Sequence, residues 1–420
     1  MSLIRSAAVA VACVLVVAAC GDGETSDRGS ADIQAVADPD VERPPPSSDH
    51  LDALVSGLND AGLELFVAAS EDSEEDTVIS PLSIGLAFGM ADVGATGDTA
   101  VALEEFFGLP ASGEQRWAAF NALDLEVGDV GGPVVRLANR QFPDVQFQTE
   151  AGYDATLARY FGVAVEPLPL QSEPEPSRER INEFVAERTE DLIPELLPSG
   201  FVNPQTVMVL VNALYMEADW ARPFGKYPTE DQPFTRLDGS TVTVPLMHEV
   251  ELRGPAVAAD TYTATELPYE GGELSMLVIV PEEGSFDEVQ ARLTGDLVDE
   301  IDAAASDSAV ELFLPRFESD LDLDLRELIA SKLGIHDVFD SPGFDGIGKG
   351  ITLEQAVHAA DIAVDEIGTV AAAATALGFE ESGPPEPDVI VRADRPFLYL
   401  IRHQPTGTVL FVGRVMDPAA

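Results

Sequence analysis

The order of hydrophobic periodicities after residue 49 is the feature that most limits how this 420-residue chain can fold. Helical spacing comes first, in residues 51–69 and 82–93, and returns in residues 181–197. Apolar runs rich in β-branched residues, which are typical of buried strands, dominate the later part of the chain. These runs are residues 134–142, 207–215, 241–247, 274–281, 309–317, 397–403 and 409–415. Neither a second linker nor a repeat interrupts the pattern, so the sequence predicts one large α+β domain over residues 49–420.

Residues 1–19 have the features of an export signal. Arg5 is followed by an apolar stretch over residues 6–17, which is too short to span a bilayer. Residues 17–20, Val-Ala-Ala-Cys, resemble a bacterial lipobox, in which cleavage before the cysteine accompanies its lipidation. The alternative is an ordinary signal peptide cut near residue 19. We expect a lipoprotein signal peptide and a lipidated Cys20, which would hold an exported protein on the outer side of the cell membrane. The alternative location is outside the cell, for a protein that carries no lipid.

Residues 20–48 are rich in Gly, Asp, Ser and Pro and have no periodic apolar face, which predicts a flexible tether between Cys20 and the domain. Cys13 would be removed with the signal peptide, so Cys20 would be the one cysteine of the processed chain. A disulfide framework is therefore excluded, even though the protein is exported.

The chain is strongly acidic, with 75 Asp and Glu against 23 Lys and Arg and a net charge of −52. Such a field repels nucleic acid and anionic lipid surfaces, so we expect no nucleic-acid partner. Solubility or adaptation to a saline habitat is one explanation of the acidity, and a basic partner is the other.

The sequence contains no clear catalytic or metal-binding motif. No serine lies in a Gly-x-Ser-x-Gly context, and the five histidines are scattered without a paired spacing for zinc. Residues 343–350 nearly match a phosphate loop, but Gly350 occupies the place of the metal-binding Ser or Thr, so a turn-rich surface loop is the better interpretation. We expect a protein that is not an enzyme and needs no cofactor or metal.

An alanine-rich segment follows residue 367, and two structures fit it. The helix propensity of alanine favours a short helix. As a strand, alternate residues from Thr369 to Phe379 would share a small or apolar face, while the opposite face ends at Glu380. Gly368 suits a hinge because glycine tolerates backbone angles that other residues cannot adopt. The same segment could thus be exposed in one state and a sheet strand in another.

Short blocks spread over nearly the whole chain after the tether make it resemble a serpin. In chain order the blocks are residues 79–84 with Gly94, Gly97 and Thr99, then 137–140, 181–189, 209–215 with Trp220, Pro223 and Phe224, then 314–317, 357–359, 393–397 and 410–415. Any one block is weak evidence of kinship, whereas their common order is specific.

The resemblance implies three β-sheets ringed by helices and an exposed reactive loop over residues 366–395. In serpins a target serine protease attacks this loop and is trapped as an acyl-enzyme while the cut loop inserts into the central sheet. By similarity, the hinge of the loop consists of Glu366, Gly368, Thr369, Val370, Ala371, Ala372, Ala373, Ala374 and Thr375. Val370 departs from the glutamate that is frequent at its position.

The resemblance also assigns residues around the central sheet. Ser80, Ser83, Asn212 and His358 match the cluster beneath the place where the strands part, although a satisfied buried polar network is an equally good interpretation of them. Trp220 and Arg316 match residues beside the start of the loop, with Arg316 paired to Glu366.

The sequence defines the position of the scissile bond less closely than it defines the hinge of the loop. The usual spacing from Gly368 places the residue before the scissile bond at Ser382, and a serine just after the bond would give Glu381–Ser382 instead. The candidates are Glu380, Glu381, Ser382 and Gly383.

No Lys or Arg occurs between Glu366 and Val391, which disfavours a trypsin-like target. We expect a monomer that inhibits a subtilisin-like, elastase-like or glutamate-specific serine protease. The alternative is a serpin-shaped binding or chaperone-like protein that traps no protease.

Overall fold

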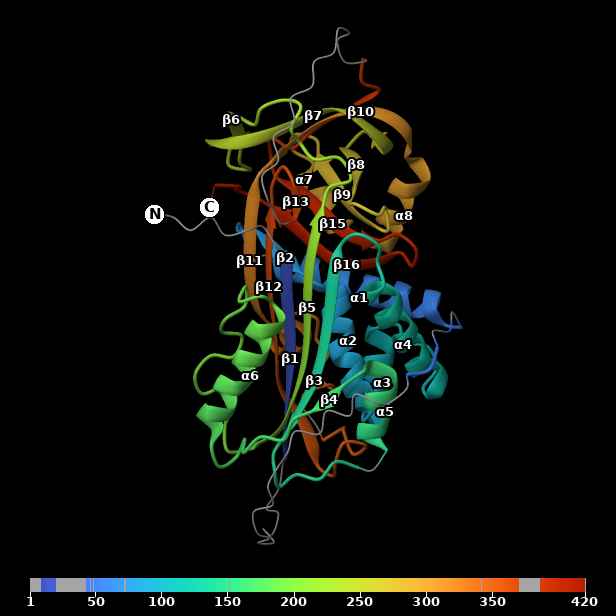
Figure 1. The fold of residues 1–420 in the computed structure, drawn as a ribbon, viewed down its shortest axis with the longest axis vertical. Helices are drawn as coiled ribbons and strands as arrows, with labels where there is room; N and C mark the ends of the chain where they lie inside the picture. Colours follow the sequence, from blue (N-terminus) through green and yellow to red (C-terminus); the bar gives the residue numbers. More distant parts are fainter. Residues whose placement is uncertain are drawn as a thin grey trace.

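The computed structural model describes residues 9–19, 43–45, 47, 49–71, 73–150, 152–340, 342–369 and 386–419. One sheet runs along the length of the molecule, and a second sheet lies across its upper end in Figure 1. The predicted α+β architecture is confirmed.

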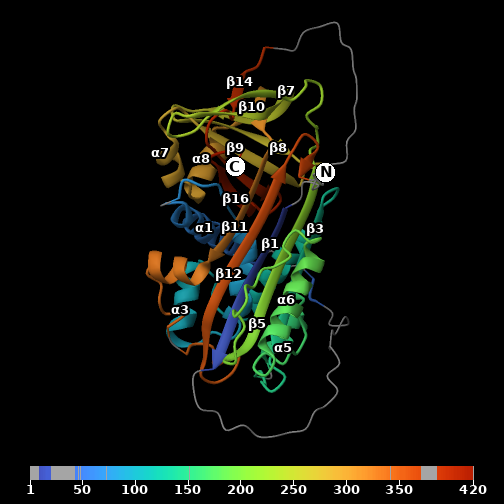
Figure 2. The same ribbon diagram turned by 90° about the vertical axis from the view of Figure 1, so that its left-hand side faces the viewer.

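Among the described residues the long sheet has seven strands, and most of them are adjacent to partners that are distant in sequence. Their order is β11 (Phe317–Asp324), β12 (Ile351–Val364), β1 (Val9–Ala19), β5 (Thr206–Asp219), β3 (Val134–Pro143) and β4 (Ala164–Val165), with β13 (Gly368–Thr369) also paired to β5. Figure 2 shows β1 lying between β12 and β5 over most of the length of the sheet.

In the part of the chain that the structure describes, the second sheet has nine strands. Their order is β14 (Val389–Arg392), β10 (Ser306–Pro315), β7 (Thr241–Ala258), β8 (Tyr262–Pro268), β9 (Leu274–Pro281), β15 (Phe397–His403), β16 (Thr408–Val415) and β2 (Thr77–Ile79), with β6 (Glu230–Thr235) also paired to β7. The resemblance implied three sheets, whereas hydrogen bonding joins the described strands into two. The reason is β7, which pairs with β6 and β10 over most of its length and with β8 only at its last residues.

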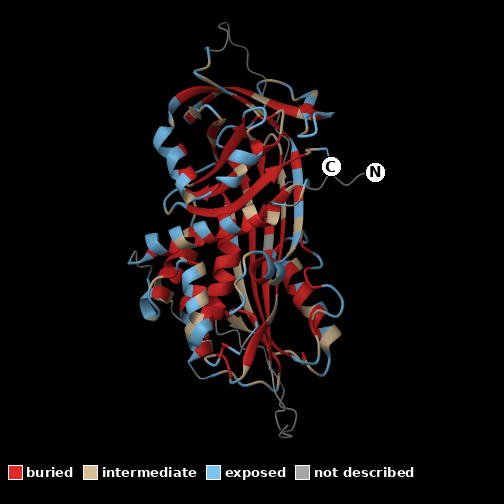
Figure 3. Ribbon diagram, turned by 180° about the vertical axis from the view of Figure 1, so that it is seen from behind, coloured by how far each residue is buried: buried red, intermediate tan, exposed pale blue. Residues whose placement is uncertain are grey.

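Helices cover both faces of the long sheet. Within the described residues the helices are α1 (Leu51–Ser70), α2 (Pro81–Asp92), α3 (Gly97–Phe106), α4 (Glu114–Gly128), α5 (Tyr153–Phe161), α6 (Pro174–Arg188), α7 (Phe286–Ala291), α8 (Gly295–Ala304) and the π-helix η1 (Glu327–Lys332). Of these, α2 lies on one face of the long sheet and α6 on the other, whereas α8 packs against β7 of the second sheet. The main core lies between the sheets and α1 and α2, and a smaller apolar cluster lies between the long sheet and α6. The central strands and α2 are therefore buried, as Figure 3 shows in red.

A local sequence signal explains where α2 begins, whereas the backbone conformation explains where α6 ends. Ser80 caps α2 by accepting a hydrogen bond from the Ser83 amide, and Pro81 occupies the first helical position. The sequence predicted a helix over 181–197, but α6 starts earlier and ends at Arg188. Glu190 and Asp191 have φ angles of 50° and 62°, and this left-handed backbone ends the helix before the apolar residues that follow.

The apolar N-terminal stretch forms β1. Cys13, Leu15 and Val17 face the main core, while Ala10, Ala12, Val14 and Val16 face the cluster with α6. This is the period-two alternation of a strand buried on both faces. Among the described residues, no helix is long and apolar enough to cross a bilayer.

The end of the predicted tether is docked on the domain. The Arg43 guanidinium donates to Asn121 Oδ1 (2.9 Å), to Asp124 Oδ2 (2.5 Å) and to the Tyr160 carbonyl (3.1 Å). Asn121 in turn donates to the Pro44 carbonyl. Residues 43 and 44 are thus held by α4 and α5, although the sequence placed them in the tether.

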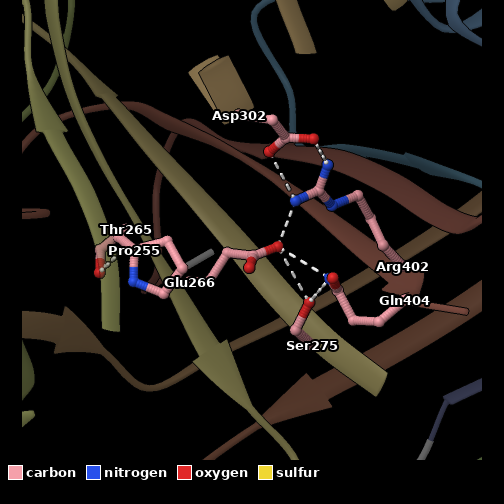
Figure 4. Close-up of polar contacts among 7 residues, drawn as sticks. All are labelled: Pro255, Thr265, Glu266, Ser275, Asp302, Arg402 and Gln404. Carbon is pink, nitrogen blue, oxygen red and sulfur yellow. Dashed lines mark hydrogen bonds and ion pairs between the residues drawn. The ribbon is translucent and has the colours of Figure 1, made fainter. Parts of the chain in front are cut away.

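A network of charged and polar side chains crosses the nine-stranded sheet (Figure 4). Arg402 on β15 makes hydrogen bonds of 2.7 and 3.0 Å to the two carboxylate oxygens of Asp302 and also binds Glu266 on β8. Gln404 and Ser275 bind the same Glu266 oxygen. Arg402 is 6% exposed, so these ion pairs hold β15 in a largely buried setting.

Glycines in residues 343–350 allow this segment to pack closely against residues 94–96. The Gly346 amide donates to the Gly94 carbonyl, and a Cβ on Gly346 would lie 2.9 Å from Gly94 Cα. The Gly343 carbonyl accepts from the Thr96 amide at 2.7 Å. The segment is a turn packed on the link between α2 and α3, in agreement with the loop interpretation.

Candidate functional site: the loop hinge and the centre of the long sheet

The chain reverses direction directly after β12, in residues 365–368. Asp365 Oδ1 accepts hydrogen bonds from the amides of Ile367 (2.8 Å) and Gly368 (3.3 Å), and the Asp365 amide donates to the Gly368 carbonyl. An Asp that binds the amides following it makes a local turn. This turn brings the chain from β12 to the neighbouring edge of β5.

Glu366 fixes the turn to the second sheet. The Arg316 guanidinium donates to both of its carboxylate oxygens, at 2.8 and 2.5 Å, and Thr229 Oγ1 donates to one of them. Burial alone would raise the pKa of Glu366, but these hydrogen bonds outweigh it and hold the pKa below its ordinary value. The predicted pairing of Arg316 and Glu366 is therefore present.

Trp220 lies beside the start of the loop, as predicted. Its indole Nε1 donates to the Asp365 carbonyl (2.9 Å), and its amide donates to the Ile367 carbonyl (2.7 Å). The ring stacks on Tyr269, with centroids 4.4 Å apart and planes 11° from parallel.

Gly368 and Thr369 form β13 and pair with Asp219 and Ala218 at the end of β5. Gly368 does not use a left-handed backbone, contrary to the reason given for it above. Its lack of a side chain matters because a Cβ there would lie 2.2 Å from the Ala218 carbonyl oxygen. Thr369 is fully buried, and its hydroxyl is 3.0 Å from Tyr269 Oη.

The four residues of the predicted sheet-opening cluster come together between α2 and the long sheet, and all are fully buried. Ser83 Oγ donates to Asn212 Oδ1, and the Ser80 amide donates to His358 Nε2 at 3.0 Å. The Asn212 amide group then donates to Asn139 Oδ1 at 2.8 Å. The cluster therefore links α2 to β12, β5 and β3.

The cluster is divided by β1. Cys13 is the register partner of Asn212 on one side and of His358 on the other. Within the described residues, His358 Nδ1 is a buried nitrogen with no hydrogen-bond partner. Burial lowers the pKa of His358 to about 3, so the ring is neutral at physiological pH.

The remaining predicted site residues lie outside the described residues. They are Cys20, the hinge residues Val370, Ala371, Ala372, Ala373, Ala374 and Thr375, and the bond candidates Glu380, Glu381, Ser382 and Gly383. The described part of the chain contains no group of three or more His, Cys, Asp or Glu side chains that could hold a metal ion.

Three residues of the site were missed by sequence reasoning: Thr229, Tyr269 and Asn139. Each makes a side-chain contact with a site residue far along the chain, to Glu366, Thr369 and Asn212 respectively, and Tyr269 also stacks on Trp220. Asn139 lies in residues 137–140, one of the blocks that resemble the serpin family, but no role was predicted for it. Nothing in the local pattern around Thr229 or Tyr269 distinguishes them from other strand or turn residues.

This site joins the turn of residues 365–368 and the strand β13 to the end of β5, and comparisons identify the family. The model of the serpin family, described as serine protease inhibitors, matches residues 56–418. The chain belongs to the serpin family.

Known relatives extend over nearly the whole domain. An uncharacterized serpin-like protein of Thermococcus kodakarensis is 32% identical over 372 residues, which are 87% of this chain and 86% of that protein. The human leukocyte elastase inhibitor is 31% identical over 382 residues, 88% of this chain and 100% of its own length. Mouse antithrombin-III is 31% identical over 367 residues, 84% and 78% of the two chains.

Solved structures agree on the fold. The native state of the thermophilic serpin tengpin has a TM-score of 0.78 at 23% identity and covers 91% of this chain and 99% of its own. A complex of thyroxine-binding globulin with thyroxine has a TM-score of 0.76 at 24% identity and covers 87% and 99%. One fold thus serves proteins with different names and ligands, so function has to be argued from the site.

Proposed function

We propose that this protein inhibits a serine-type endopeptidase by the trapping reaction of its family, with the loop of residues 366–395 as bait. The position of β13 carries the proposal. Gly368 and Thr369 already pair antiparallel with the end of β5, and they run toward its centre. A loop cut beyond them could continue along β5 in the same register.

The residues of the loop suit such insertion. In the register set by Thr369, alternate residues up to Phe379 would face the main core, and all of them are small or apolar. At about 1 kcal/mol net per hydrogen bond, a strand of this length would contribute on the order of 10 kcal/mol. A native state with the loop outside the sheet therefore has a higher free energy than the inserted state, and a kinetic barrier keeps the two apart.

Specificity is proposed from the same loop. Cleavage at one of the bonds among Glu380, Glu381, Ser382 and Gly383 would suit a subtilisin-like, elastase-like or glutamate-specific protease. The names of the elastase inhibitor relatives are consistent with a small-residue target.

We further propose that the processed protein is a monomer that begins at a lipidated Cys20 and is held on the outer side of the cell membrane. The run Val-Ala-Ala-Cys supports this location. If it is correct, Cys20→Ser moves the protein from the membrane fraction to the soluble fraction, and an unchanged distribution would contradict it.

The inhibitory claim is tested on a denaturing gel. The protein processed before Cys20 is mixed with subtilisin, elastase, a glutamate-specific protease or trypsin. We expect a band that contains both proteins and resists boiling in detergent with at least one of the first three, and only cleavage or no reaction with trypsin. If none of the proteases gives such a band, the binding or chaperone-like alternative is favoured.

A further inference from the structure

We propose that the central position of the long sheet is a binding site for the chain's own N-terminal segment, and that a chain retaining this segment is locked against inhibition. The segment is β1, Val9–Ala19. The second half of the proposal rests on the proposed function, because a loop must need that position for the lock to matter.

The pairing of β1 is extensive on both sides. Residues from Ala10 to Ala19 are in register with β12, and residues from Val9 to Ala18 are in register with β5, with one irregularity on each side. β12 and β5 have no other partner on these edges along that length, within the residues described. Without β1 the two edges would have to close on each other or find another strand.

The side chains of β1 fill both faces of the position. Ala10, Ala12, Val14 and Val16 are fully buried on the side of α6. Cys13 and Leu15 are fully buried on the opposite side, against the main core. No charged residue occurs between residues 6 and 19, so the strand brings no unpaired charge into the sheet.

β13 and β1 lie end to end on the same edge of β5. Thr369 pairs with Ala218, Val9 pairs with Met216, and only Glu217 separates the two partners. Both strands are antiparallel to β5, so they run in the same direction. A loop that continued the register of β13 would place residue 371 opposite Met216 and residue 375 opposite Asn212.

Those positions are already occupied by Val9 and Cys13. One edge of β5 cannot pair with two strands at once, so β1 and an inserted loop exclude each other. The proposed cleavage before Cys20 would therefore do more than release a leader: it would free the position that the reaction needs.

The test compares full-length chains, with processing prevented by expression in the cytoplasm. The first is the unaltered chain, and the second carries Val14→Asp and Val16→Asp, which place two carboxylates in the cluster beside α6. The control carries Ser6→Asp, since residue 6 lies outside β1. Val14→Thr with Val16→Thr is a milder pair that keeps the shape of both side chains, in case the aspartates prevent folding.

Hydrogen exchange gives a readout that does not depend on inhibition. We expect the amides of residues 208–215 and 352–360 to exchange at least tenfold faster in the aspartate variant than in the unaltered chain, and the Ser6→Asp control to match the unaltered chain. Equal exchange in the unaltered and aspartate chains would overturn the binding site.

Protease trapping gives the second readout. We expect the variant, but not the unaltered chain, to form the detergent-resistant complex. Equal trapping by both chains would overturn the lock. If exchange differs but neither chain traps any protease, the binding site stands and the inhibitory function is what fails.

Discussion

The two sheets hold their central strands in different ways. β15 belongs to a hairpin with β16 and is fastened by the ion pairs of Arg402 to Asp302 and Glu266 (Figure 4). β1 reaches the centre of the long sheet from the far end of the chain, and its buried side chains are small or aliphatic. Around it lies a cluster of neutral polar groups, which includes a histidine nitrogen that has no hydrogen-bond partner among the described residues. The nine-stranded sheet is therefore fastened at its centre by ion pairs, whereas the long sheet has a central strand that could be exchanged.

The largest effect is expected at Thr369, where the loop meets the long sheet. Thr369→Arg should convert an inhibitor into a substrate, because a guanidinium cannot enter the buried position beside Tyr269 without a partner. The molar ratio of inhibitor to protease needed for full inhibition should rise at least tenfold. The matched control is Glu386→Arg, at an exposed residue beyond the bait region, and it should leave the ratio unchanged. Full inhibition by Thr369→Arg would contradict insertion.

The second-largest effect is expected in the nine-stranded sheet, at Arg402. Arg402→Met removes the cation from two carboxylates, one of them on the largely buried Glu266, and should cost about 3–5 kcal/mol in the free energy of unfolding. Urea denaturation measures this cost. The inhibitory ratio should not change, since the network lies outside the long sheet. A changed ratio with normal stability would mean that the two sheets are not independent.

Asn212→Ala tests the buried polar cluster between α2 and the long sheet. It leaves the buried Ser83 hydroxyl and Asn139 Oδ1 without the partner that Asn212 supplies, at a cost of about 2 kcal/mol in the free energy of unfolding. Asn59→Ala, which removes hydrogen bonds that water can replace at the surface, is the control and should cost less. Equal losses in urea denaturation would show that the cluster has no special role.

His358 should make the long sheet sensitive to acid. Its pKa is about 3 in the folded protein against an ordinary value of 6.5, so the unfolded chain binds the proton first. The stability that depends on the neutral ring is complete above pH 6.5 and is lost as the pH falls toward 3, at about 1.4 kcal/mol per pH unit. Asp76 acts in the opposite sense, because burial raises its pKa to about 6 and folding then favours its protonated form. The measurement is therefore the difference between the unaltered protein and His358→Gln across pH 7 to 4; a difference that does not vary with pH would contradict this role of His358.

The smallest effect is expected at the hinge ion pair. Arg316 has a half-exposed side chain, so Glu366→Gln should change stability by less than about 1 kcal/mol. The exposed pair Arg136 and Glu190 offers a comparison through Glu190→Gln. A much larger loss at Glu366 would mean that the turn of residues 365–368, and not packing around Thr369, holds the loop in place.

Sequence patterns were sufficient for elements whose periodicity is decided locally. The opening helix, α2 with its Ser-Pro start, and strands such as β9 and β16 were predicted within a few residues of their ends. The end of α6 was not, because left-handed residues at 190 and 191 stop a helix whose apolar pattern continues.

Those patterns could not predict which distant segments of the chain come into contact. Ordered blocks were enough to assign Trp220, Arg316 and the cluster around His358. The apolar pattern of residues 6–17 predicts an export signal, and only the facing edges of β5 and β12 show that residues 9–19 also fit the sheet as a strand. Docking of Arg43 on Asp124 depends on one contact across 81 positions of sequence, which no periodicity records.

The most direct test of the exchange of strands is a crystal structure of the protein processed before Cys20 and cut in its loop by subtilisin. The loop should then lie between β5 and β12, with residue 371 opposite Met216 and Thr375 opposite Asn212 and His358. A structure in which β5 pairs directly with β12 while the cut loop lies in solvent would contradict both the trapping mechanism and the exchange of strands.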